Sequence, residues 1–166
     1  MTRVHIIIGH TKRGSHTRTV AEELADAVCD DGPHQRCVTE LADYGSELFS
    51  AESEAVAGLV TKVRSAELLV VASPTYKGAY TGILKSFLDW FPADSLIGVR
   101  AVPVMTGGDL RHALAPEVHL RPLLVELGAT VPTRAFYLPM SEYETRAQQL
   151  ASWIQDSGAN MDVLVR

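Results

Sequence analysis

A polar loop with two cations follows the first apolar run of the chain, and its residue types suit a phosphate group. This first loop reads Gly9-His10-Thr11-Lys12-Arg13-Gly14-Ser15-His16-Thr17 and directly precedes a segment with helical periodicity. Hydroxyl groups, cations and the unpaired N–H groups of a helix start together favour an anion. The spacing fits neither a Walker loop nor GxGxxG, so we expect a monophosphate. Simple capping of the helix by Ser15 or Thr17 is the alternative, and this loop alone does not decide.

The second loop, Ser73–Gly78 (SPTYKG), follows a run that reads as a buried strand. Pro74 fixes its own φ and pushes the preceding residue into extended geometry, so the strand ends there. The loop offers backbone N–H groups, one aromatic face and a glycine that permits close approach. A flat isoalloxazine ring needs these features. The plainer alternatives are that Tyr76 packs on Tyr80 and that Lys77 is a solvated cation.

The third loop, Thr106-Gly107-Gly108, ends another strand-like run. Two adjacent glycines form a bare turn or leave room for a cofactor against the main chain. Each loop is weak evidence when taken alone. In a parallel sheet, however, ligands bind outside the carboxyl ends of the strands, and all three loops are expected at that edge.

Strand-like and helix-like segments alternate from end to end. The strands are expected at Val4–Ile8, Gln35–Leu41, Leu68–Ala72, Arg100–Met105 and Ala135–Leu138. The helices are expected at Thr17–Cys29, Ala51–Ser65, from Thr81 or Gly82 onward, Asp109–Leu127 and from Ser141 onward. This order predicts an α/β, flavodoxin-like doubly wound parallel sheet with strand order 2-1-3-4-5 and helices on both faces. We expect one domain over residues 1–166.

Several residues predict where helices end, bend or begin. Asp31-Gly32-Pro33 is expected to end the first helix, and Gly128 to stop the fourth. Pro116 and Pro122 predict a kink or break in the fourth helix, because each proline removes a backbone donor. At the start of the last helix, Ser141 and Glu144 have the spacing of a capping box.

Composition excludes several classes of function. The net charge is −5, so there is no basic surface for nucleic acid or for a membrane. The apolar runs are far shorter than the ~20 residues of a membrane-spanning helix, and the N-terminus does not read as a signal peptide. Two cysteines are too few for a disulfide framework or a zinc cluster, which favours a cytoplasmic protein.

Several other histidine and tryptophan residues could take part in chemistry, but we do not assign them to a functional site. His112 and His119 lie seven residues apart without a third ligand, so we expect no metal site. Trp90 and Trp153 are interpreted as packing or subunit-contact residues. No Ser/His/Asp constellation is visible, and we nominate no catalytic side chain.

Two segments resemble the NADPH-dependent FMN reductase family, and the resemblance spans nearly the full chain. Residues 72–92, ASPTYKGAYTGILKSFLDWFP, resemble the family segment PxYxxxxxGxLKxxLD. Residues 106–129, TGGDLRHALAPEVHLRPLLVELGA, are similar to reductases that serve two-component alkanesulfonate and luciferase-like monooxygenases. The resemblance implies an NAD(P)H-dependent FMN reductase that transfers hydride to flavin N5 and supplies FMNH2 to a partner monooxygenase.

The resemblance also implies which residues bind FMN. The phosphate would be held by Lys12, Ser15 and Thr17, with His10 and His16 in the same loop. The ring would be lined by Pro74, Thr75, Tyr76, Lys77 and Gly78, and on its other edge by Thr106, Gly107 and Gly108. His10 and Lys12 stand where the family usually has Ser and Arg, and lysine lacks the bidentate fork of arginine.

Two questions stay open on the sequence. Family members are commonly homodimers or homotetramers, and Asp109–Leu127 is the candidate interface. A related reductase has a π-bulge in this helix. The spacing of the apolar residues in this chain does not require one. The alternatives to a flavin reductase are a flavodoxin-type electron carrier, or a quinone, azo-dye or metal-oxyanion reductase with bound FMN.

Overall fold

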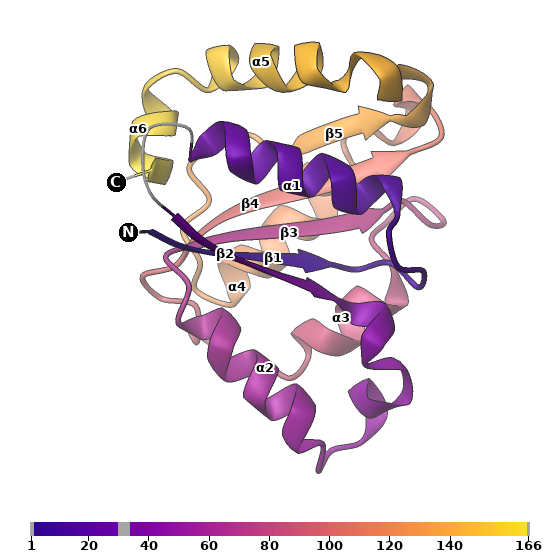
Figure 1. The fold of residues 1–166 in the computed structure, drawn as a ribbon, viewed down its shortest axis with the longest axis vertical. Helices are drawn as coiled ribbons and strands as arrows, with labels where there is room; N and C mark the ends of the chain where they lie inside the picture. Colours follow the sequence, from indigo (N-terminus) through magenta and orange to yellow (C-terminus); the bar gives the residue numbers. More distant parts are fainter. Residues whose placement is uncertain (1, 30–33, 166) are drawn as a thin grey trace.

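Five parallel strands form the central sheet in the order β2-β1-β3-β4-β5 (Figure 1). The computed structural model describes residues 2–29 and 34–165, so the predicted helix stop at 31–33 lies outside the described residues. The predicted topology is confirmed. The strands are β1 Thr2–Ile8, β2 His34–Glu40, β3 Leu68–Pro74, β4 Arg100–Gly107 and β5 Phe136–Pro139.

Helices cover both faces of the sheet (Figure 1). On one face lie α1 His16–Val28, α5 Arg146–Ser157 and α6 Ala159–Val165; on the other lie α2 Glu54–Arg64, α3 Gly82–Leu88 and α4 Arg121–Glu126. No helix among these residues is long and apolar enough to cross a bilayer.

Strand β3 at the centre shows why the sheet needs two helical layers. All seven of its residues are buried. Leu69 and Val71 pack into the core on the α2/α3 side, whereas Leu68 and Val70 pack into the core on the α1/α5 side. Side chains alternate across a strand, so an uninterrupted apolar run requires cover on both faces. The more polar β2 lies at the edge, as predicted.

The segment between β4 and β5 is broken, as the two prolines predict. A 3₁₀ turn at Leu110–His112 is followed by a π-helical turn at Pro116–Leu120 and then by α4. The N–H of Arg121 donates to the carbonyl of Pro116, five residues earlier. Pro122 has no N–H to continue the α-helical ladder, which is consistent with a local change of pitch. Gly128 follows α4 at φ +91°, which confirms the predicted stop.

The predicted capping box is wrong. Ser141 and Glu144 lie within a 3₁₀ helix, Met140–Thr145, and α5 begins only at Arg146. Residues on either side of this boundary make tertiary contacts to α1: Arg146 binds Glu23 through its guanidinium group, and the Tyr143 ring packs on His16 with ring centroids 4.2 Å apart.

Candidate functional site

A cleft of about 400 Å³ lies at the carboxyl ends of β1, β3 and β4. All three predicted loops line this three-loop cleft, and its volume falls within the range of small-molecule sites. From the predicted set it contains His10, Lys12, Ser15, His16, Thr17, Pro74, Thr75, Tyr76, Thr106, Gly107 and Gly108. The predicted convergence of the loops is therefore confirmed, although a cleft by itself does not identify its ligand.

Three lining residues were not among the predicted site residues: Arg13, Gly14 and Met140. Arg13 and Gly14 belong to the first loop, in which the sequence analysis had noted the cation but not the role of Gly14. Met140 directly follows β5. Because β5 is parallel to the other strands, its end lies at the same edge of the sheet.

Two predicted residues, Lys77 and Gly78, do not line this cleft. They form the tip of a tight turn in which Tyr76 and Ala79 exchange backbone hydrogen bonds of 2.9 and 3.3 Å. Both have positive φ, +55° at Lys77 and +84° at Gly78. Two successive left-handed residues are typical of a type I′ turn, which gives Gly78 a conformational role besides the predicted close approach. Their contact with a flavin stays a prediction.

At the start of α1, the capping role of Ser15 is confirmed. Its hydroxyl oxygen accepts from the N–H of Arg18 at 3.2 Å. An oxygen that accepts in a cap still has its own hydrogen to donate. The cap and a phosphate contact are therefore compatible, so the two alternatives for this loop need not compete. Lys12 and Arg13 are exposed beside it, and Arg13 forms an ion pair with Asp43.

Thr17 and Thr106 link the first loop to the third. Their hydroxyl groups lie 2.7 Å apart, and both side chains are buried. One hydroxyl donates to the other, so only the accepting one has a hydrogen left for a ligand. The bond fixes the spacing between the N-terminus of α1 and the end of β4.

His10 and Tyr76 connect the first loop to the second. The ring of His10 meets the Tyr76 ring edge-on, with centroids 6.1 Å apart, and its Nε2 lies 3.5 Å from the Tyr76 hydroxyl. The Nδ1 atom accepts from the N–H of Lys12 at 2.9 Å, which places the proton of the neutral ring on Nε2. Burial, and then the charge of Lys12, lower the pKa of His10 and favour this neutral form. Tyr76 thus contacts His10, a neighbour that the sequence did not suggest.

Tyr137 of β5 packs against the third loop, and the sequence analysis did not identify it. Its hydroxyl donates to the carbonyl of Asp109 at 2.6 Å. A Cβ on Gly107 would overlap the Tyr137 hydroxyl, so only glycine fits there without rearrangement. Burial raises the pKa of Tyr137, which keeps the hydroxyl protonated as a donor. Within β5 it reads only as one more aromatic strand residue.

Thr75 joins the second loop to the third and carries a buried hydroxyl group beside the cleft. Its N–H donates to the carbonyl of Thr106 at 2.7 Å, which holds the second loop against the third. Thr75 lines the three-loop cleft, but its Oγ1 is buried and has no well-oriented hydrogen-bond partner among the described residues. The neighbouring polar group is the Tyr137 hydroxyl, whose pKa burial raises and Thr75 lowers slightly. Buried hydroxyls are normally paired. A bound ligand would reach this oxygen only after the Thr75 side chain turns toward the cleft.

The residues set aside in the sequence do not contribute to this cleft. Trp90 donates from Nε1 to the carbonyl of Leu48, and Trp153 donates to that of Arg134, both at 2.9 Å. Both tryptophans pack against the hydrophobic cores, as predicted. Among residues 2–29 and 34–165, no group of three His, Cys, Asp or Glu side chains could hold a metal ion.

Comparisons with known proteins agree with the geometry. A family model described as NADPH-dependent FMN reductase matches residues 2–142. A Pseudomonas aeruginosa protein named FMN reductase (NADPH) is 33% identical over 150 residues, covering 87% of this chain and 77% of that one. The NADH-dependent FMN reductase SfnE of Pseudomonas putida is 34% identical over 155 residues, covering 89% and 83%. The apo crystal structure of the NADH:FMN oxidoreductase EMOB superposes with a TM-score of 0.84 at 31% identity, covering 95% of this chain and 88% of that one.

Proposed function

Because this chain belongs to the NADPH-dependent FMN reductase family, we propose that its activity, the reduction of FMN by a nicotinamide nucleotide, takes place in the three-loop cleft. The observation that carries this assignment is the convergence of the three loops, which brings the cations and hydroxyls of the first loop to the same cleft as the backbone of the second and third. Relatives are named for NADPH and for NADH, so we assign no preference between the two reductants.

The two ends of the cleft suit the two ends of FMN. Lys12, Ser15 and the N-terminus of α1 supply positive charge and donors for the phosphate. We assign the ring to Pro74, Thr75 and Tyr76 on one side and to the third loop on the other. Gly107, whose Cβ position is already filled by Tyr137, leaves bare backbone next to the ring edge.

The protein's role in this reaction is to position the flavin and the nicotinamide, and it needs no general acid or base of its own. When bound, FMN would supply the electron sink for hydride from the reduced nicotinamide, at its N5 atom. The protein residues hold the phosphate and one edge of the ring and leave one ring face open for the nicotinamide. We therefore nominate no catalytic side chain.

We also propose that the chain forms a homo-oligomer through the segment between β4 and β5. Four large apolar side chains are exposed along it: Leu110, Leu114, Val118 and Val125. Isolated exposed apolar residues are ordinary, but several of them on one short segment favour an interface. The resemblance of residues 106–129 to reductases of two-component systems supports a flavin-dependent monooxygenase as the consumer of FMNH2. The reductant and the two free cysteines favour the cytoplasm.

Anaerobic titration tests the proposed activity. The purified protein is titrated with NADPH and with NADH, each with and without added FMN, and the loss of yellow flavin absorbance is followed. We expect bleaching that depends on the protein and on FMN. A protein that neither binds FMN nor bleaches it with either nucleotide would contradict the proposal.

A further inference from the structure

We propose that Glu40 is a positioning residue for the phosphate end of the cleft. Its carboxylate holds the turn at Gly14 in the conformation that presents the N-terminus of α1 to the FMN phosphate. The inference rests on the proposed function, and Glu40 itself is assigned no contact with FMN.

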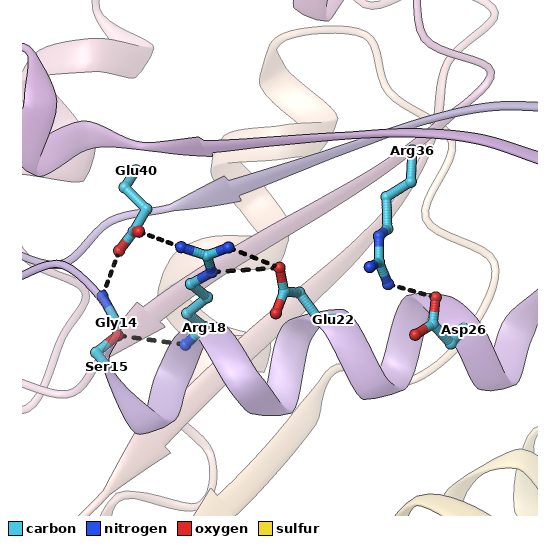
Figure 2. A network of polar contacts seen from close by, with 7 residues as sticks. All are labelled: Gly14, Ser15, Arg18, Glu22, Asp26, Arg36 and Glu40. Atoms are coloured by element: carbon cyan, nitrogen blue, oxygen red, sulfur yellow. Dashed lines mark hydrogen bonds and ion pairs between the residues drawn. The ribbon is translucent and has the colours of Figure 1, made fainter.

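Glu40 is the last residue of β2, and its side chain points toward the start of α1 (Figure 2). It is 8% exposed. Its Oε2 accepts from the N–H of Gly14 at 2.8 Å, and its Oε1 accepts from Nη1 of Arg18 at 2.5 Å. A carboxylate so far from solvent is stable only when it is paired and hydrogen-bonded. Both of its oxygens have a partner, and both partners flank the start of α1.

Arg18 connects this carboxylate to the helix cap. Its guanidinium group binds Glu40 and also reaches Oε1 of Glu22 through Nε and Nη2, each at 3.2 Å. The backbone N–H of the same residue donates to the Ser15 hydroxyl (Figure 2). One buried acid therefore fixes Gly14 directly and restrains the first turn of α1 through Arg18.

The conformation of Gly14 makes this restraint matter. Gly14 has φ +61°, a left-handed geometry between the exposed cations Lys12 and Arg13 and the cap at Ser15. Glycine adopts many other conformations at little cost, so a turn built on it needs an external bond to stay in one of them. Glu40 supplies that bond from the next strand. Without it, the turn at Gly14 loses its bond to β2, and the loop is restrained only by its remaining contacts, such as the ion pair of Arg13 with Asp43.

The experiment compares FMN with riboflavin, which carries the same ring without the phosphate. The variants are Glu40→Ala, which removes both bonds, and Glu40→Gln, which retains an acceptor for Gly14 but loses the charge. Flavin dissociation constants are measured by titration, and thermal unfolding confirms that each variant is folded. The matched control is Asp26→Asn, because Asp26 also pairs α1 with β2, through Arg36 at 2.5 Å, but farther along the helix (Figure 2).

We expect Glu40→Ala to weaken FMN binding roughly tenfold while riboflavin binding stays unchanged. Glu40→Gln is expected to lie between this variant and the wild type, and Asp26→Asn to match the wild type for both flavins. A general loss of structure would move both flavins together, so the ratio of the two constants is the diagnostic quantity. An unchanged ratio in Glu40→Ala, or in Glu40→Gln if the alanine variant does not fold, overturns the inference.

A second measurement does not depend on flavin. Amide hydrogen exchange at Gly14 and Ser15 is expected to be faster in Glu40→Ala than in the wild type and Asp26→Asn. Unchanged exchange there contradicts the positioning role. If instead exchange responds but the wild type binds neither flavin, it is the proposed function that fails, so the two failures are distinguishable.

Discussion

The hydroxyl groups of Thr17 and Thr106 lie 2.7 Å apart, although the two residues are separated by 89 positions in the sequence. One belongs to the first turn of α1 and the other to the end of β4. Their bond joins two walls of the three-loop cleft and lies out of contact with solvent. The geometry of the cleft thus depends on a polar contact inside the protein as well as on the loops at its surface.

Removing both partners of this pair is expected to destabilise the protein by less than the sum of the two single removals. Thr17→Val leaves the buried Thr106 hydroxyl unpaired and is expected to lower the free energy of unfolding by about 1–3 kcal/mol. Adding Thr106→Val to it removes the unpaired group, so the double variant should lose less than the sum of the single losses. Urea denaturation of the four proteins in a double-mutant cycle measures this. Additive losses would show that the two hydroxyls do not interact.

The adjacent glycines of the third loop are expected to respond differently to alanine. At Gly107 a methyl group meets the Tyr137 hydroxyl and ring, so Gly107→Ala should cost about 1–3 kcal/mol of stability. Gly108→Ala is the control, because nothing lies within 4 Å of its Cβ position and its φ is not left-handed. Thermal or urea unfolding compares the two. Equal losses would contradict the packing of Tyr137 against Gly107.

The charge of Lys12 is expected to act on the flavin phosphate and not on the ring. Lys12→Ala should weaken FMN binding several-fold at low salt, less at high salt, and leave riboflavin binding unchanged. Lys62→Ala, in the last turn of α2, makes the same change of charge away from the cleft residues and serves as the control. Titrations at two salt concentrations provide the test. Equal effects of both variants on FMN would argue against a phosphate contact by Lys12.

Buried His5 is expected to make the fold less stable as the pH falls. Its Nε2 lies 2.9 Å from the Thr39 hydroxyl, and burial, followed by the charge of Lys62, lowers its pKa from 6.5 to about 4. Between these values the unfolded chain binds a proton at this histidine and the folded chain does not. The unfolding free energy therefore falls as the pH drops from 6.5 to 4, by up to about 3 kcal/mol.

The His5→Gln variant isolates this contribution, because glutamine still offers a polar group to Thr39 and does not titrate. Urea denaturation at several pH values between 4 and 7 should give a shallower pH dependence for the variant than for the wild type. Parallel curves would show that another group is responsible.

Much of the fold and of the cleft could be predicted from the sequence. The apolar runs at β1, β3 and β4 are continuous, and alternation with helical segments leaves a parallel sheet as the arrangement that buries both faces. Once the strands are parallel, their carboxyl ends share one edge, so loops far apart in the sequence must meet there. This is why His10, Pro74 and Gly107 line one cleft, as expected.

The tertiary structure alone decided the features that depend on partners distant in sequence. The start of α5 moved from Ser141 to Arg146, where the guanidinium group binds Glu23 of α1. Glu40 reads as an ordinary polar residue at a strand end, and Tyr137 as an ordinary aromatic one. A sequence pattern records which face a side chain takes, because that follows from backbone periodicity. It does not record which remote carbonyl or amide a buried polar group will meet, because that depends on how the helices pack on the sheet.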